Sequence, residues 1–286
     1  MGKLNFRQLW RIDIVMSDIS VVILTKDEHL HIGRCLERLR NLNPREIFVV
    51  DCFSADKTQE IARQYGATVI VHEWPGNQAA QFQWALDNLP IESKWILRLD
   101  ADEYLTGEVI LEIKDKLQQL DEDIDGIVLK RRHVVGWLDN RWIKHGMYPT
   151  RILRLFRSGY GRSDMKLMDE HIVVEGKIVE FDNDFVDHSL IQFADWKAKH
   201  RVYAKREAQS YLSGEESTGE KAAKKIKYYK LPPYFRAFAY FCIRYFLKLG
   251  FLDGLAGFRW HFWQGLWYRC LVDREIGKLK RKGLNG

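Results

Sequence analysis

Residues 19–51 read ISVVILTKDEHLHIGRCLERLRNLNPREIFVVD, and this stretch indicates the fold class of the chain. It opens with a continuous apolar run rich in β-branched residues and closes with a second apolar run. Between them, Ile32, Cys35, Leu36 and Leu39 recur at helical spacing. Apolar strands joined by amphipathic helices are typical of a parallel sheet covered by helices on both faces. We therefore predict an α/β domain that begins with this β-α-β unit.

The alternation of strands and helices continues as far as residue 100. It predicts helices over 55–66 and 77–89 and strands over 67–73 and 94–100. After residue 125 strand-like runs dominate until a helix predicted over 193–213. The strands predicted there are 125–136, 152–158 and a hairpin-like pair, 171–176 with 177–182. The predicted fold is a Rossmann-like, mostly parallel sheet flanked by helices.

Composition narrows the class of protein and its compartment. The 286 residues are 46% apolar and 29% charged, as in globular proteins. Four scattered cysteines without a CxxC pair exclude a zinc ribbon and a disulfide scaffold, and they fit a reducing compartment. The sequence has no apolar run long enough for an ordinary transmembrane helix, and its first 15 residues lack the apolar region of a signal peptide. We therefore expect a cytoplasmic protein.

Charge is distributed unevenly along the chain. Residues 221–286 carry 15 Lys and Arg against three acids, and they also hold 16 of the 37 aromatic residues. The rest of the chain is net acidic, which predicts a body and a tail with different roles. We divide the chain into an N-terminal extension (1–17), a catalytic α/β domain (18–212), a linker (213–230) and a basic, aromatic, amphipathic helical tail (231–286).

Polar side chains follow the predicted strands at the edge where open α/β sheets bind ligands. Asp51 ends the second strand, and Asp100 and Asp102 follow the fourth. Two carboxylates one residue apart can approach one Mg²⁺ or Mn²⁺ ion, whose other positions are filled by phosphate and water. The sequence lacks GxGxxG and GxxxxGK[ST], so a glycine phosphate cradle is not supported. The alternatives are a solvated turn in which Asp102 caps a helix, and a helix-entry role for Asp51.

Several motifs together resemble a known family. They are TKDE (25–28), VVDCFSADKTQEIA (49–62), LRLDADEYL (97–105) and, more loosely, MDEHIVVEGKI (168–178), DHS (187–189), GFLDGLAGF (250–258) and WYRCLVD (267–273). The chain resembles family 2 glycosyltransferases of the GT-A fold, and among them bacterial enzymes that build lipopolysaccharide cores, O-antigens, capsules and exopolysaccharides. The resemblance implies inverting transfer from a nucleotide-diphosphate sugar, by default a UDP-sugar, with Mg²⁺ or Mn²⁺ on the diphosphate.

The resemblance also implies roles for single residues at the strand ends. Thr25 and Glu28 would line the nucleotide pocket, and Asp51 would contact the base. Asp100 would lie near the ribose and the metal, and Asp102 would coordinate the metal.

The general base would be a carboxylate in the acidic motif that follows the sheet. The family's other branches have the order Glu-Asp, whereas this sequence has Asp169-Glu170. We favour Glu170 as the base that takes the acceptor's proton, with Asp169 second. The alternative is an exposed turn before residues 171–176.

Other residues are weaker candidates for the site. His188 could bind the metal or the leaving phosphate or be structural, and Gln81 could touch the donor sugar. Lys199, with its neighbours on one helix, could contact an anion or form a solvated face. The stretch 136–149 is rich in aromatic and basic residues, so we interpret Trp142, Lys144 and His145 as part of the acceptor site or, alternatively, as an ordered surface loop.

The tail predicts attachment to a membrane surface. Arg236, Arg244 and Lys248 would share about a third of a helix circumference. An interfacial helix would direct these cations to anionic headgroups and bury rings, among them those of Trp260, Trp263 and Trp267. This would place the enzyme peripherally on the cytoplasmic face of the inner membrane, beside a lipid-linked saccharide acceptor. The alternative is that the tail packs on the catalytic domain or forms a homo-oligomer.

Two other functions remain open at the level of sequence. One is a nucleotidyltransferase on a similar sheet, although the segment after the first strand lacks the glycine-rich basic loop of that class. The other is a non-catalytic, membrane-bound carbohydrate or scaffold protein. We expect no nucleic-acid partner. Hydrolysis of nucleotide sugars with and without Mn²⁺ separates these classes.

Overall fold

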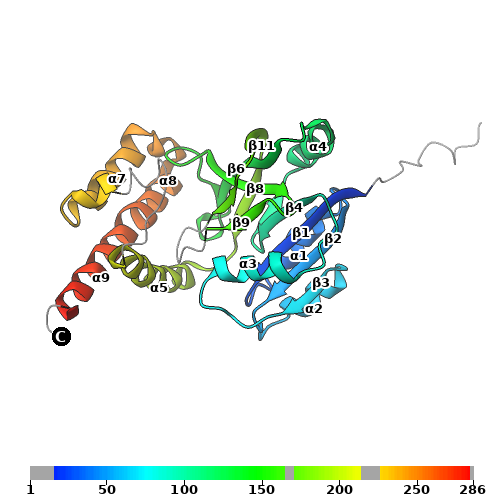
Figure 1. Cartoon of the computed structure of the whole chain (residues 1–286). Helices are drawn as coiled ribbons and strands as arrows, with labels where there is room; N and C mark the ends of the chain where they lie inside the picture. Colours follow the sequence, from blue (N-terminus) through cyan, green and yellow to red (C-terminus); the bar gives the residue numbers. More distant parts are fainter. Residues whose placement is uncertain (1–15, 165–170, 214–225, 284–286) are drawn as a thin grey trace, which may run out of the picture.

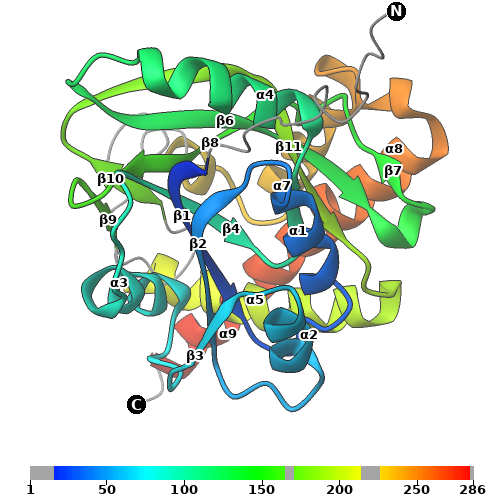
Figure 2. The ribbon, with the colours of Figure 1, turned by 90° about the vertical axis from the view of Figure 1, so that its right-hand side faces the viewer.

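The computed structural model describes residues 16–164, 171–213 and 226–283. In these ranges one sheet has the strand order β3-β2-β1-β4-β8-β6-β11-β5, with β7 paired to β6, and helices cover both of its faces (Figure 1, Figure 2). A separate antiparallel pair joins β9 to β10. The strands are β1 (Ser17–Thr25), β2 (Pro44–Asp51), β3 (Thr68–Val71), β4 (Trp95–Asp100), β5 (Glu103–Leu105), β6 (Ile124–Val135), β7 (Arg141–Trp142), β8 (Thr150–Arg157), β9 (Gly161–Ser163), β10 (Ile172–Val174) and β11 (Lys177–Ser189).

The helices fall into an N-terminal group around the sheet and a C-terminal group beside it (Figure 1). The α-helices are α1 (Ile32–Leu39), α2 (Thr58–Gln64), α3 (Gln78–Asn88), α4 (Gly107–Lys116), α5 (Phe193–Leu212), α7 (Phe235–Cys242), α8 (Gly254–Trp260) and α9 (Tyr268–Gly283). Short 3₁₀ segments are η2 (Leu117–Gln119), η3 (Gly136–Leu138) and η5 (Gly250–Asp253), and η4 (Ile243–Leu247) and η6 (His261–Trp267) are π-helical.

Strand β1 lies at the centre of the parallel half of the sheet. It pairs in parallel with β2 on one side and with β4 on the other. Because successive side chains point to opposite faces, Val21 packs in one core cluster with Ile32 of α1, and Val22 packs in another with Phe82 of α3. The predicted α/β sheet flanked by helices is therefore confirmed.

The second half of the sheet is mixed, and one predicted pairing there is wrong. Residues 171–176 and 177–182 do not form a hairpin, because β10 pairs with β9 and β11 runs parallel to β6. Strand β11 carries Phe181 and Phe185, and both rings are buried in the main core. That burial requires β11 to lie in the large sheet and not beside its neighbour in sequence.

The C-terminal helices pack on the catalytic half of the chain. Helix α9 lies along α5, and Ala208 and Val272 share one apolar cluster between them (Figure 1). Trp260 of α8 packs with Trp196 of α5 and Ile143, the residue after β7, in a second cluster. The tail and the sheet-bearing half are therefore joined by shared apolar clusters.

This packing corrects the predicted membrane-facing residues. Arg236 and Arg244 are only 3% and 5% exposed, and Trp260 is buried as well. Trp263 and Trp267 are half-buried in the aromatic clusters between α5 and the tail, whereas Lys248 is exposed. Buried cations cannot meet lipid headgroups, so the prediction is wrong for Arg236, Arg244 and Trp260. In the described ranges, no helix is both long and apolar enough to cross a bilayer.

Candidate active site

The carboxyl ends of three neighbouring strands meet at one edge of the sheet. Thr25 is in register with Asp51, and Leu24 is in register with Asp100. The sequence therefore brings its predicted nucleotide-binding and metal-binding residues to the same edge, as the β-α order requires.

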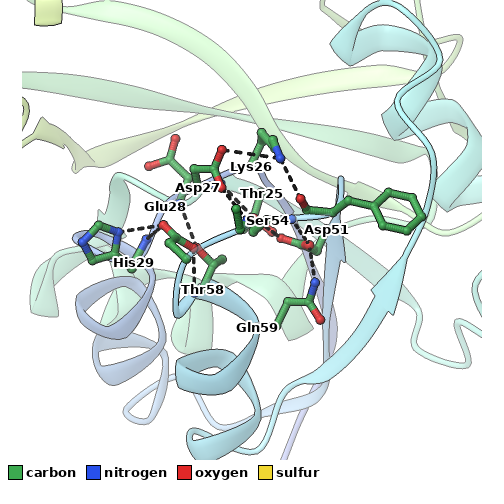
Figure 3. A network of polar contacts seen from close by, with 12 residues as sticks. Thr25, Lys26, Asp27, Glu28, His29, Asp51, Ser54, Thr58 and Gln59 are labelled. Atoms are coloured by element: carbon green, nitrogen blue, oxygen red, sulfur yellow. Dashed lines mark hydrogen bonds and ion pairs between the residues drawn. The ribbon is translucent and has the colours of Figure 1, made fainter.

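Asp51 organises this edge from inside the protein (Figure 3). Its carboxylate accepts hydrogen bonds from Thr25 Oγ1 at 2.9 Å, from the backbone N–H and the hydroxyl of Ser54 at 2.8 and 2.5 Å, and from Gln59 Nε2 at 2.7 Å. Four donors occupy the lone pairs of a carboxylate, and Asp51 has no exposed surface. The predicted contact with a nucleotide base is therefore not present in this geometry, because Asp51 holds the β2–α2 loop against β1.

The loop after β1 is tied to a distant part of the chain. His31 Nε2 accepts a hydrogen bond from the backbone N–H of Leu190 at 2.9 Å, so its proton lies on Nδ1 and is donated to Glu28, 2.6 Å away. The backbone N–H of Glu28 donates to Thr58 Oγ1. Glu28 is thus placed at the ligand-binding edge by contacts from α1, α2 and the segment after β11.

Asp100 at the end of β4 lies among buried arginines. Its Oδ2 accepts from Arg154 Nη2 at 3.1 Å, and Arg98 Nη2 lies 3.6 Å from its Oδ1. Burial alone would raise the pKa of Asp100, but Arg154 and Arg98 outweigh it and lower the pKa. Arg154 also donates to the buried Glu103 of β5. Despite these partners, the buried Oδ1 of Asp100 accepts no hydrogen bond.

A third carboxylate, Asp187 of β11, also lies in this group. Asp187 is in register with Glu103 on one side and His133 on the other, and its Oδ2 lies 3.1 Å from His133 Nδ1. Burial would raise its pKa, but His133 and then Arg131 lower it. The cluster thus contains three arginines but four carboxylates, the fourth being Asp102.

Asp102 is the carboxylate without a cationic partner. Among the described residues, no arginine or lysine lies within ion-pair distance of it. Burial, together with the negative charges of Asp187, Asp100 and Glu28, raises the pKa of Asp102 to about 7. Asp102 is therefore a surplus carboxylate, because no lysine or arginine among the described residues pairs with it.

This surplus fits a divalent cation. Mg²⁺ and Mn²⁺ prefer carboxylate oxygens and take only one or two from the protein when phosphates and water supply the others. The carboxylate of Asp102 and the Oδ1 of Asp100, which accepts no hydrogen bond, provide such oxygens. In the part of the chain that the structure describes, no three His, Cys, Asp or Glu side chains form a ready-made metal site. A bound substrate would have to complete the ligand set.

His188 lies beside Asp102 but is held by the protein. Its backbone N–H donates to the carbonyl of Asp102 at 3.0 Å. Burial, with the charges of Arg34 and His31, lowers the pKa of His188 to about 4. The neutral ring accepts from Arg34 through Nδ1 at 2.8 Å and donates from Nε2 to Asn140 at 2.7 Å. Both ring nitrogens are engaged, so the predicted role as a metal ligand would require the bond to Asn140 to break.

Gln81 does not reach the site. It has no exposed surface, and its Oε1 lies 2.9 Å from His72 Nδ1 after β3. A donor sugar needs an accessible partner, so the predicted contact with Gln81 is wrong in this geometry.

The proposed acceptor loop is anchored to the tail. Asp253 accepts from the backbone N–H of His145 at 2.8 Å and contacts its Nδ1 at 2.7 Å. Trp142 is half-buried, and the Arg132 guanidinium lies 4.5 Å from its ring centroid. Lys144 is exposed. Its ammonium lies 5.5 Å from the centroid of the Trp142 ring, so two of the three predicted acceptor residues contact each other.

The two candidate bases, Asp169 and Glu170, lie outside the described residues. The residues on either side are held together, because the backbone N–H of Asp164 donates to the carbonyl of His171 and the backbone N–H of His171 donates to Oδ1 of Asp164. The backbone N–H of Ser163 also donates a hydrogen bond to Gln83 Oε1 of α3, at 3.0 Å. The assignment of the base stays a prediction.

The sequence analysis missed the arginines and the partner carboxylates. Arg98 and Arg154 interrupt otherwise apolar strands, and Glu103 directly follows the acidic pair. A charged residue in a buried strand needs a partner, so these interruptions were a usable signal. Asp187 lies far from Asp100 in sequence, so no sequence pattern linked it to the acidic pair.

A family comparison decides the class of protein. The model of glycosyl transferase family 2 matches residues 20–174, which is more than half of the chain.

The chain belongs to glycosyl transferase family 2. An uncharacterized glycosyltransferase of Rickettsia felis is 41% identical over 99 residues, 35% of this chain and 34% of that protein. One of Rickettsia typhi is 37% identical over 99 residues, 35% and 32% of the two chains. The match thus spans about a third of these relatives' length.

Solved structures are more distant from this family 2 glycosyltransferase. Glucosyl-3-phosphoglycerate synthase from Mycobacterium tuberculosis, crystallised with Mn²⁺, UDP and glucosyl-3-phosphoglycerate, is 17% identical with a TM-score of 0.34, covering 46% of this chain and 50% of that chain. Mannosyl-3-phosphoglycerate synthase from Rubrobacter xylanophilus is also 17% identical with a TM-score of 0.34, covering 42% and 41%.

Proposed function

We propose that this family 2 glycosyltransferase transfers a sugar, with inversion, from a UDP-sugar to a lipid-linked saccharide in the synthesis of a bacterial surface polysaccharide. The family supports a nucleotide-sugar donor. The choice of UDP as the nucleotide, of a lipid-linked acceptor and of a surface polysaccharide as the product is inferred from the resemblance of the sequence motifs to the family. The observation that carries the proposal is the surplus carboxylate at the end of β4.

That surplus provides a place for the donor's metal. Asp102 and Asp100 would hold Mg²⁺ or Mn²⁺, which when bound offsets the negative charge of the departing diphosphate. Without such a cation, burial and the neighbouring Asp187 disfavour the ionised form of Asp102. The chain's own residues therefore favour a site that takes up a cation together with a phosphate.

Lys199 of α5 faces the same group. Burial would lower its pKa, but Tyr203 and the charges of Glu28 and Asp102 outweigh it and raise the pKa. A protonated ammonium at this position can bind the leaving diphosphate. Glu170, or Asp169 in its place, would take the proton of the acceptor hydroxyl.

A donor panel tests the proposal. Purified protein is offered UDP-, GDP-, dTDP- and CMP-sugars with and without Mn²⁺, and release of the nucleotide is measured. We expect Mn²⁺-dependent release from a UDP-sugar. The same panel run with nucleoside triphosphates and sugar phosphates should give no product, and product there would support a nucleotidyltransferase.

Two base variants sharpen the test. Glu170→Gln keeps the shape but cannot take a proton, so we expect donor binding to persist and transfer to fall roughly 10²–10⁴-fold. If Asp169→Asn is the impaired variant, the roles are exchanged. Full activity in both variants would place the base elsewhere, and no release from any donor would contradict the proposed function.

A further inference from the structure

The C-terminal segment carries an unusual share of the exposed apolar surface. Of the twenty-four large apolar side chains that are exposed in the described residues, thirteen lie within residues 226–258. Seven of them cluster around the turn between η4 and α8, and we call these seven the apolar tip: Phe246, Leu247, Leu249, Phe251, Leu252, Leu255 and Phe258. Contiguous exposed apolar side chains of this kind mark a surface that another body covers.

Ring contacts show that the tip is one surface. Tyr245 lies within 6.3 Å, between ring centroids, of Phe246, Phe251 and Phe258. The intervening leucines belong to the same tight turns, since Leu249 donates to the carbonyl of Phe246 and Leu252 donates to that of Leu249. In Figure 1 this segment lies beside α7 and α8, at the end of the molecule away from β1–β3.

The interior of the turn is filled by backbone and by the His261 ring, so the large side chains point outward. A Cβ on Gly257 would lie 2.3 Å from the carbonyl oxygen of Gly250, and one on Gly250 would lie 2.5 Å from His261 Nε2. Leu247 and Leu255 are the most exposed, at 77% and 73%. The apolar side chains of the tip therefore project into solvent.

The exposed charges in the tip's own segment have a single sign. In residues 246–259 the exposed charged side chains are Lys248 and Arg259, both of them basic. The one acid in this range, Asp253, is turned inward to His145. A two-fold contact between copies would bring like charges together, whereas an anionic lipid surface complements them.

We propose that the apolar tip docks this enzyme on an anionic lipid bilayer, with the leucines and phenylalanines among the acyl chains and Lys248 and Arg259 at the headgroups. An exposed apolar surface accompanied by lysine and arginine is the arrangement of interfacial membrane anchors. Each cation near an anionic surface strengthens attachment roughly fivefold. The docking residues are thus different from the buried arginines that the sequence pattern indicated.

Vesicle sedimentation tests this docking. The full chain is mixed with vesicles of equal parts phosphatidylglycerol and phosphatidylcholine, or of phosphatidylcholine alone. We expect sedimentation with the anionic vesicles, weakened by high salt, and little with the neutral ones. The double variant Leu247→Glu with Leu255→Glu should reduce binding at least about tenfold.

Leu111→Glu on α4 is the matched control, because Leu111 is 69% exposed and lies outside the tip. It should bind as the unchanged chain does. A milder pair, Leu247→Ser with Leu255→Ser, should weaken binding less, and circular dichroism should show all variants folded. Release of nucleotide from a soluble donor should be equal in all of them, so loss of docking is distinguishable from loss of the proposed function.

Two results would overturn the proposal. One is failure of the unchanged chain to sediment with anionic vesicles at low salt. The other is a dimer, measured by light scattering, that the double glutamate variant converts to monomer while vesicle binding is absent or unchanged. The second result would make the tip an interface between copies of this chain.

Discussion

Buried charges occur in two regions of this molecule, and their balance differs. In the tail, Arg236 and Asp273 form a closed pair that is 4% and 1% exposed. Beside it, Glu207 accepts from Arg269 at 2.6 Å and from Tyr268 at 2.7 Å. At the end of β4, by contrast, Asp102 has no cationic partner among the described residues, and Asp100 keeps an oxygen that accepts no hydrogen bond.

The difference separates structural charge from functional charge. A buried ion pair that is fully hydrogen-bonded holds elements in one arrangement and leaves nothing for a ligand. A surplus of buried carboxylates raises the pKa of one of them and attracts a cation from outside. The following predictions test this contrast, beginning with the largest expected effect.

Removing the surplus charge should abolish activity without unfolding the protein. We expect Asp102→Asn to lower Mn²⁺-dependent transfer at least about 10³-fold, because the cation loses its ionised ligand. The free energy of unfolding should stay equal or rise, since repulsion from Asp187 and Asp100 is relieved. Urea titration and nucleotide release measure the two effects. Asp115→Asn on the exposed face of α4 is the control, and equal activity in both variants would contradict the assignment.

Breaking the buried ion pair in the tail, in contrast, should destabilise the protein. We expect Asp273→Asn to lower the free energy of unfolding by about 3–5 kcal/mol, because Arg236 remains buried without a counter-charge. Denaturant titration measures this change. Replacing both partners, Arg236→Met with Asp273→Leu, should recover most of the loss. If the single variant is as stable as the unchanged protein, the pair is not as buried as described.

His261 connects the tail to the acceptor loop, and this contact should weaken at low pH. This ring has no exposed surface and donates to the carbonyl of His145, while burial and Arg244 lower its pKa to about 4. Between pH 6.5 and 4 the unfolded chain binds a proton that the folded chain does not, so stability falls as the pH falls.

Its contribution over that range is roughly 1–3 kcal/mol. His261→Gln keeps a donor but does not titrate, so unfolding followed against pH should show a shallower fall than in the unchanged protein. His188 and His200, whose pKa values are also lowered to about 4, leave part of the slope in the variant. Identical slopes would show that His261 is accessible to protons when folded.

An exposed ion pair should matter least. Arg45 Nη2 lies 3.1 Å from Glu92, and both side chains are largely in solvent. We expect Arg45→Ala to change the free energy of unfolding by at most about 0.5 kcal/mol, since water and salt screen the pair. A loss as large as that of Asp273→Asn would mean that exposure does not govern the energy of these pairs.

Much of the parallel half of the fold could be predicted from the sequence. The strands that end at Thr25, Asp51 and Asp100 are predominantly apolar, and the helices between them have regular apolar spacing. Such patterns are local, because a period of two or of 3.6 residues is set by backbone geometry. Their alternation then places the strand ends at one edge of the sheet.

The candidate site could be predicted only in part. Asp100 and Asp102 were found because they adjoin each other, but their environment comes from Arg154 and Asp187, which other strands supply. Gln81 was misplaced because a polar residue on a helix can equally be buried, where it contacts His72. The chemistry of a side chain is in the sequence, but its accessibility is not.

The sequence by itself determined the β-α units, the acidic strand ends and the basic, aromatic character of the tail, because each follows from neighbouring residues. Only the tertiary structure decided that β11 pairs with β6 and β5, that Arg236 and Arg244 are buried, and that Asp102 has no cationic partner in the described chain. Burial and charge balance are sums over residues distant in sequence, and folding alone brings those residues together.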